Sequence, residues 1–141
     1  MQISTRGRYG LKAMIALAAC RGAGNVSLRA LSAGLGISEN YLEQMMAQLK
    51  KAGLLSAMRG AYGGYSLSRP PDKVTAGDVL RALEGNLAPV SCLVNERATC
   101  GTSDCGACST KVFWNRLHDN VNEFVDSVTL EDLVHNDTNL N

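Results

Sequence analysis

Four of the five cysteines lie close together, and their thiols have the clearest chemical potential in the sequence. They follow the spacing Cys92-x7-Cys100-x4-Cys105-x2-Cys108, whereas Cys20 lies far away in an apolar stretch. Four thiolates on one loop can hold an iron–sulfur cluster or a tetrahedral zinc ion, or they can act as a thiol redox switch. The spacing leaves these three possibilities open. Because free cysteine behaves as a small hydrophobe, we expect Cys20 to be buried.

A second group of residues has the chemistry to read DNA. Near the start of one predicted helix, Ser, Asn and Gln side chains can hydrogen-bond base edges, and Glu can accept from cytosine N4. These residues are Ser38, Glu39, Asn40, Glu43 and Gln44. Arg59 is followed by glycine, and a slim basic tip can enter a narrow minor groove. The alternative is a winged helix used for protein contacts.

Helices and a hairpin are predicted to position these residues. Apolar residues at Leu11, Met14, Ile15 and Ala18 have helical spacing, and Ser27 and Ser38 can cap two further helices. Residues 54–58 and 62–67 are predicted to pair as a β-hairpin, because glycines between them can supply its turn. A hairpin directly after a helix-turn-helix is a wing. The expected fold is therefore mostly α, a winged helix-turn-helix with a β-hairpin wing and a long C-terminal helix.

The second half of the chain is predicted to carry a sensor and a dimerisation element. Residues 91–110 have no apolar period, whereas 109–128 has apolar residues spaced as in a heptad. We expect this helix to pair with a second copy; the alternative is packing on its own chain. We divide the chain into a DNA-binding region (1–74), a linking helix (75–90), a cysteine loop (91–108), a dimerisation helix (109–128) and a tail (129–141).

The charge distribution supports this division. The net charge is only +1, but residues 1–75 hold ten Lys or Arg against three Asp or Glu, and residues 76–141 hold four against ten. A basic half joined to an acidic half is typical of a nucleic-acid-binding region with an appendage. The uncharged run 13–20 is too short for a membrane span, so we expect a cytoplasmic protein without a membrane partner. No enzyme motif is present, and we expect no catalysis.

Several longer motifs resemble a known family. They are residues 1–10 (MQISTRGRYG), 37–44 (ISENYLEQ), 59–65 (RGAYGGY) and 129–133 (TLEDL). Together they are similar to the winged-helix regulators that include IscR, NsrR and CymR. The cysteine loop before a Trp-bearing helix is most similar to the IscR branch, while the first two-thirds also resembles CymR.

This resemblance implies a homodimer that binds pseudo-palindromic double-stranded DNA operators. By position, Ser38, Asn40 and Glu43 are expected in the major groove, and Tyr41 and Gln44 near the backbone. Arg59 is expected in the minor groove, presented by a wing that contains Gly60 and Gly64. Glu43 is also the expected discriminator between operator classes.

The resemblance further implies a [2Fe–2S] cluster, with a [4Fe–4S] cluster or zinc as alternatives. The loop departs from the family pattern because Lys111 stands where a histidine is expected. The expected ligands are therefore Cys92, Cys100, Cys105 and Cys108. This set predicts a sensor of cluster status that controls cluster-assembly genes, with a cluster donor as a further partner. The alternative is a CymR-like regulator of cysteine and sulfur metabolism, or a nitric-oxide or redox sensor, acting through thiols or a metabolic-enzyme partner.

Overall fold

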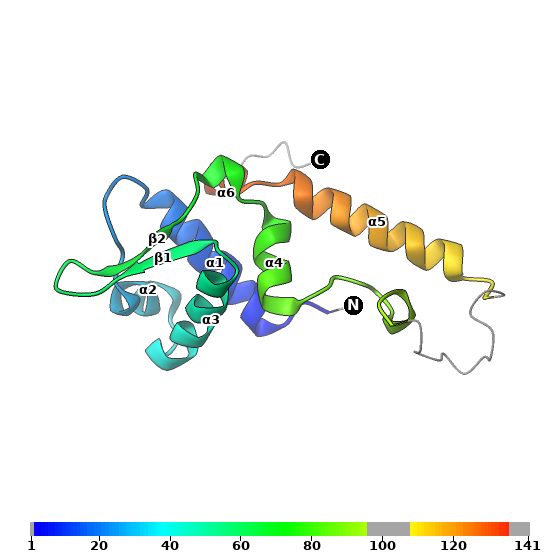
Figure 1. The fold of residues 1–141 in the computed structure, drawn as a ribbon, viewed down its shortest axis with the longest axis horizontal. Coiled ribbons are helices and arrows are strands. Elements are labelled where there is room, and N and C mark those ends of the chain that lie inside the picture. Colours follow the sequence, from blue (N-terminus) through cyan, green and yellow to red (C-terminus); the bar gives the residue numbers. More distant parts are fainter. Residues whose placement is uncertain (1, 96–107, 136–141) are drawn as a thin grey trace.

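The computed structural model describes residues 2–95 and 108–135, and it is mostly helical with one two-stranded hairpin (Figure 1). Three helices and the hairpin form the N-terminal part, which we call the head. Its elements are α1 (Thr5–Ala19), α2 (Leu28–Leu35), α3 (Glu39–Lys51), β1 (Leu55–Met58) and β2 (Gly64–Leu67). Because α2 and α3 are joined by a short turn at Gly36 and are followed by the hairpin, the predicted arrangement is present.

The three helices of the head each begin at a serine whose side chain caps them. The hydroxyls of Ser4, Ser27 and Ser38 accept hydrogen bonds from the backbone N–H three residues later, at 3.4, 3.1 and 3.2 Å. Such a bond satisfies an N–H that has no partner inside the helix. The serines therefore fix where α1, α2 and α3 begin.

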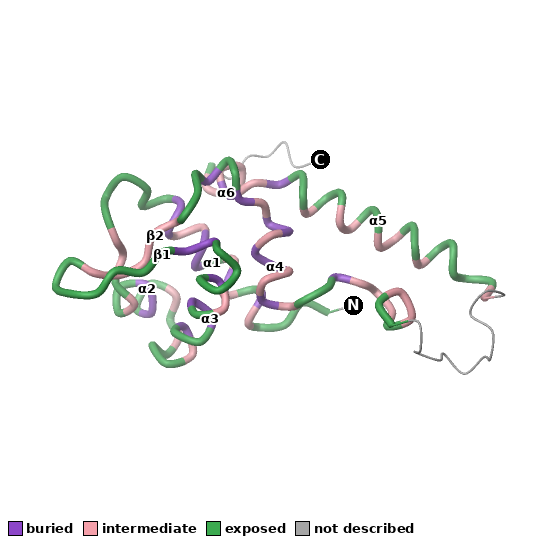
Figure 2. Tube along the Cα trace, viewed as in Figure 1, coloured by how far each residue is buried: buried purple, intermediate pink, exposed green. Residues whose placement is uncertain are grey.

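The head shares one apolar core with α4, seen as the buried parts of α1, α3 and α4 in Figure 2. Helix α3 buries one stripe and leaves the opposite face in solvent. The fully buried side chains include Met14 from α1, Leu42, Met45, Met46 and Leu49 from α3, and Val79 from α4. Because this stripe is completely covered, the outer face of α3 is held at a fixed angle.

The hairpin is antiparallel, with Leu55 opposite Leu67 and Met58 opposite Gly64. It is shorter than predicted at both strands. A third segment joins it, because Val26 and Tyr65 exchange two backbone hydrogen bonds of 2.9 and 2.8 Å. The segment before α2 therefore ties the wing to the helix-turn-helix.

The remaining elements leave the head and return to it. They are η1 (Pro71–Lys73), α4 (Ala76–Glu84), η2 (Ser91–Leu93), α5 (Lys111–Ser127) and α6 (Leu130–Val134). Helix α5 extends away from the head, and none of its residues is buried (Figure 2). We call α5 the arm. No helix among the described residues is long and apolar enough to span a membrane.

Helix α6 was not predicted, because residues 129–141 were expected to form a tail. Thr129 and Asp132 form a capping box that starts this helix, and Leu130 is completely buried in the core of the head. The backbone N–H of Leu130 bonds the carbonyl of Val74 at 2.9 Å, and that of Ala76 bonds the carbonyl of Val128 at 2.8 Å. The end of the arm is thus anchored to the head.

Candidate DNA-binding surface and cysteine segment

The outer face of α3 presents polar side chains to solvent. Asn40, Glu43 and Gln44 are exposed, and Tyr41 is half-buried against the core. Ser38 is exposed as well, but its hydroxyl already caps the helix by accepting from Tyr41 N–H. Asn40, Glu43 and Gln44 are therefore free to hydrogen-bond base edges. The Ser38 hydroxyl instead stabilises the first turn of α3.

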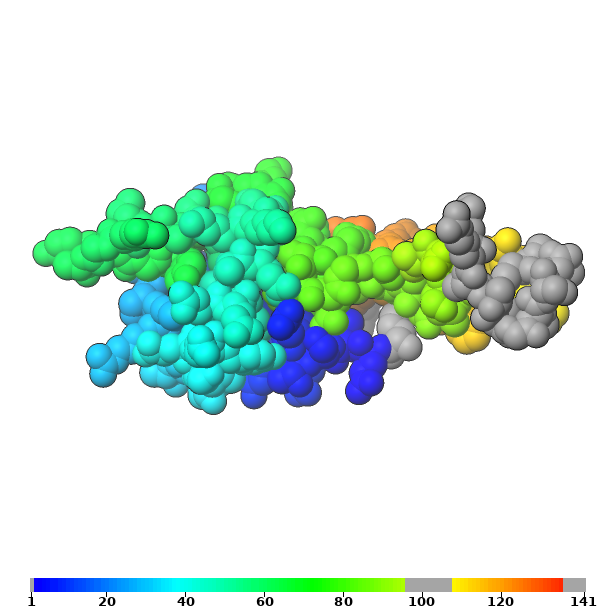
Figure 3. All heavy atoms as spheres, turned by 60° about the horizontal axis from the view of Figure 1, so that its bottom comes forward, coloured from blue at the N-terminus to red at the C-terminus, as the bar shows by residue number. Residues whose placement is uncertain are grey.

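A groove of about 540 Å³ separates α3 from the wing. It brings together four of the predicted residues, Glu43, Arg59, Gly60 and Gly64. The other predicted DNA contacts do not line it; they are Ser38, Asn40, Tyr41 and Gln44. Figure 3 shows the wing, in green, projecting at one end of the molecule beyond α2 and α3. The surface thus has two separate projecting elements, α3 and the wing, as contact with adjacent grooves of DNA requires.

Two contacts that hold the wing in place, made by Asn25 and Gly64, were not predicted from the sequence. The side-chain amide of Asn25 donates to Met58 Sδ at 3.6 Å and to the carbonyl of Tyr62 at 3.4 Å, on either side of the wing tip. Gly64 has φ +143°, and a Cβ there would overlap the carbonyl oxygen of Val26. Only glycine lets the two backbones come this close. The one local signal in the sequence was that Asn25 is a polar residue two positions before the Ser27 cap.

Tyr65 lines this groove, and burial has the largest effect on the pKa of its phenol. Burial raises the pKa of the Tyr65 phenol, and the negative charge of Glu43 raises it further. Both effects disfavour the phenolate, so Tyr65 stays a neutral hydrogen-bonding group at neutral pH. Lys50 and Arg59 line the same groove and supply positive charge that can face phosphate.

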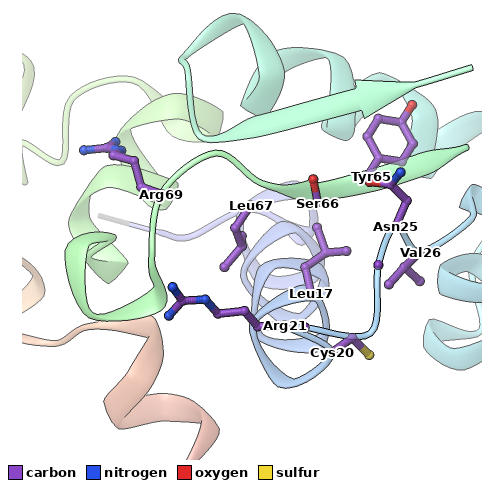
Figure 4. A pocket seen from close by; sticks show the side chains of 11 residues that line it. Leu17, Cys20, Arg21, Asn25, Val26, Tyr65, Ser66, Leu67 and Arg69 are labelled. Atoms are coloured by element: carbon purple, nitrogen blue, oxygen red, sulfur yellow. The ribbon is translucent and has the colours of Figure 1, made fainter.

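A smaller pocket of about 300 Å³ lies between the end of α1 and strand β2 (Figure 4). Cys20 and Arg21 approach it from α1, and Ser66, Leu67 and Arg69 from β2 and the segment after it. The expectation of a buried Cys20 is wrong: this residue is the exposed C-cap of α1, where the helix ends and the chain leaves the core.

Residues 85–110, which we call the cysteine segment, join α4 to the arm in the sequence. Cys92 lies in η2 and Cys108 lies three residues before α5; both are half-buried. The Sγ of Cys108 is 3.4 Å from Thr110 Oγ1. Cys100 and Cys105 lie outside the described residues. Within the described residues there is no group of three or more His, Cys, Asp or Glu side chains that could hold a metal ion.

The arm presents apolar side chains that are covered only in part within the described residues. Trp114, Leu117 and Val121 are half-exposed, Phe124 is 54% exposed, and Phe113 packs edge-on against Trp114. Four of the predicted heptad residues therefore lie on α5 with part of their surface free, as pairing with a second copy requires. The fifth, Val128, does not follow the prediction, because it is the buried residue that ends the helix.

Comparison with known proteins agrees with this geometry. Residues 3–136 match the Rrf2 family, described as "Iron-dependent Transcriptional regulator". The transcriptional regulator CymR of Bacillus subtilis is 46% identical over 133 residues, covering 94% of this chain and 89% of CymR. The transcriptional regulator IscR of Sodalis glossinidius is 35% identical over 137 residues, covering 97% of this chain and 81% of IscR.

Solved structures are similar over the same length. The structure of CymR, described as the global cysteine regulator of B. subtilis, is 44% identical with a TM-score of 0.80, covering 96% of this chain and 98% of CymR. IscR of T. potens is 39% identical with a TM-score of 0.77, covering 96% and 88% of the two chains. These similarities confirm the predicted winged-helix fold. The relatives are transcriptional regulators and not enzymes, as expected.

Proposed function

This chain belongs to the Rrf2 family of DNA-binding transcriptional regulators, and from that premise we propose that it controls genes of cysteine and sulfur metabolism. The observation that carries this choice is the higher identity to CymR, 46% against 35% for an IscR, over nearly the whole chain. The B. subtilis relative is described as a global cysteine regulator. We propose that the protein acts as a homodimer on pseudo-palindromic DNA, with α3 in the major groove and Arg59 in the minor groove.

The state of the four clustered thiols is the proposed signal. Cys92 and Cys108 stand at the two ends of the segment between α4 and α5. If two of the four thiols give two protons and two electrons to an external disulfide, whose S–S bond breaks to leave two thiols, the new S–S bond in the protein constrains this segment. A structure of Staphylococcus aureus CymR is described as an oxidised form, so a relative has one. A constrained segment would reposition the arm relative to the head.

A second candidate function is cluster sensing, and the donor set favours it. Four thiolates are the ligands that iron–sulfur clusters use, and Cys92, Cys100, Cys105 and Cys108 fit that set. Lys111 is exposed at the first position of α5 and adds no suitable ligand. A bound cluster would supply an iron centre sensitive to redox conditions. The protein's own part would then be to order the segment between α4 and α5.

One preparation separates the two candidates. The protein is purified anaerobically, and iron, acid-labile sulfide, zinc and reactive thiols are measured per chain. Cysteine sensing predicts five titratable thiols with little metal, whereas cluster sensing predicts iron and sulfide in equal amounts with the four clustered thiols protected. Stoichiometric zinc would contradict both. Replacement of the four clustered cysteines by serine is the matched control, because it leaves Cys20 as the one titratable thiol.

The binding sites in the genome provide a second test. Cysteine control predicts occupancy upstream of genes for cysteine and sulfur metabolism, and cluster control predicts occupancy upstream of cluster-assembly genes. Occupancy is mapped with and without added cysteine. Sites at neither class of gene would overturn the proposed function even if the metal analysis were clear.

A further inference from the structure

One face of helix α4 carries polar or small residues that contact the arm and the start of α1. Gly77, Arg81 and Glu84 recur at i, i+4 and i+7, which places them on one face of this helix. The first two contact the arm, and the third contacts the start of α1. α4 is rigid over this distance, because Thr75 and Asp78 form a capping box and Val79, Leu80 and Leu83 are buried.

The joint between α4 and the arm is a clasp around Arg81. Its guanidinium donates to both carboxylate oxygens of Asp126, at 2.7 and 2.9 Å, and to Asn122 Oδ1 at 2.7 Å. This bond raises the pKa of Arg81 and lowers that of Asp126. Within residues 2–95 and 108–135 it is the only salt bridge between an arginine or lysine and a carboxylate. The clasp and the α6 anchor together hold the arm against α4 and the head.

The joint between α4 and the head is made by Glu84. One of its carboxylate oxygens accepts from the backbone N–H of Ser4 at 2.9 Å, from the Ser4 hydroxyl and from the N–H of Gly7 at 3.2 Å. These are N–H groups at the positive end of α1, where a carboxylate is favoured. Leu83 fits against Gly10 beside it, so α1 and α4 are in close contact over two turns.

The two joints are built alike. A Cβ at Gly7 would overlap the carboxylate of Glu84, and a Cβ at Gly77 would overlap the carboxylate of Asp126. At each joint, therefore, a carboxylate on the later helix approaches a glycine on the earlier one. From this pattern we infer that α4 couples the arm to the head, with Arg81 and Glu84 as positioning residues that relay the angle of α5 to the N-terminus of α1.

The inference deepens the proposed function, on which it rests, because it names the route from the cysteine segment to the DNA-binding surface. When the segment before the arm changes, the Arg81 clasp passes the displacement to α4. Glu84 then passes it to α1, which packs against the helix-turn-helix. Neither residue is expected to touch DNA.

Amide hydrogen exchange on the full chain tests the relay without any assumption about the signal. Asp126→Asn removes the negative charge of the clasp at a position that is 122 residues away from Ser4 in the sequence. It should raise exchange at the Ser4 and Gly7 amides about two- to fivefold, the range for a partly exposed ion pair. Asp119→Asn makes the same chemical change on an exposed part of α5 and should raise neither. Arg81→Lys, which keeps the charge but not the two-pronged bond, should behave like Asp126→Asn. Unchanged exchange at Ser4 and Gly7 in both clasp variants would overturn the relay.

Operator affinity then separates failure of the relay from failure of the proposed function. The affinity of the reduced and the diamide-oxidised protein is compared for a duplex selected by the wild type from a random pool. The relay predicts a smaller ratio of the two affinities in Asp126→Asn and an unchanged ratio in Asp119→Asn. No difference between the two states of the wild type would contradict thiol sensing, while the exchange result would still decide the relay. A wild-type difference that Asp126→Asn retains in full would contradict the relay alone.

Discussion

The head and the arm differ in what holds them. The head encloses Met14, Leu42, Met45 and Leu49 without exposure, whereas α5 buries no residue (Figures 1 and 2). The arm is bonded to α4 through the Arg81 clasp and is linked to the head through the α6 anchor. Close-packed side chains allow few alternative arrangements, and a polar clasp allows more. We therefore propose that DNA recognition rests on the rigid head and that adjustment rests on the arm, which has few contacts.

The largest expected effect compares a core leucine of the head with a half-exposed leucine of the arm. Leu49→Ala should lower the free energy of unfolding by about 2–5 kcal/mol, because Leu49 is completely buried. Leu117→Ala should cost less, and its urea midpoint should depend on protein concentration if α5 pairs with a second copy. An arm variant as costly as the head variant at every concentration would contradict the comparison.

A second prediction contrasts arginines of the two regions in DNA binding. Arg59→Ala removes the basic tip of the wing and should weaken operator binding about tenfold or more, with a shallower dependence on salt. Arg116→Ala removes the same charge from the arm and should change affinity little. Fluorescence anisotropy across a salt series measures both. Equal affinity of Arg59→Ala and the wild type would make the wing assignment wrong.

The smallest expected effect is a pH dependence of the clasp. The Arg81 hydrogen bond lowers the pKa of Asp126 below its ordinary value. Its stabilisation is therefore present above the unfolded pKa of about 4 and is lost as the pH falls through the folded pKa. Because both side chains are partly exposed, we expect about 1 kcal/mol or less.

Urea denaturation of the wild type and Asp126→Asn checks this dependence. The difference in unfolding free energy should be constant from pH 6 to 8 and should shrink progressively as the pH falls below about 4. A difference that grows as the solution is acidified would contradict the assigned sign.

Local signals in the sequence predicted the head well. Ser27 and Ser38 cap the helices they were expected to cap, and the apolar period of residues 42–49 gives the buried stripe of α3. These features depend on neighbours within a few residues. The capping box that starts α4, formed by Thr75 and Asp78, is likewise a contact between residues three positions apart.

Contacts between distant residues could not be predicted in this way. The bonds from Glu84 to Ser4 and Gly7, from Asn25 to the wing and from Arg81 to Asp126 join positions 33 to 80 residues apart. The burial of Leu130 depends on the return of the chain to the head, and the exposure of Cys20 depends on where α1 ends. None of these is encoded in a local period.

We propose that the head reads DNA and that the oxidation state of the cysteine segment sets its affinity for DNA. The most direct measurement is the operator dissociation constant of the anaerobically prepared protein, before and after oxidation, beside a variant with serine at positions 92, 100, 105 and 108. We predict a change of about five- to 150-fold in the wild type, the usual range of coupling between two sites, and none in the four-serine variant, which still binds DNA. Equal affinity of the wild type in both states, or an equal change in the four-serine variant, would contradict the account.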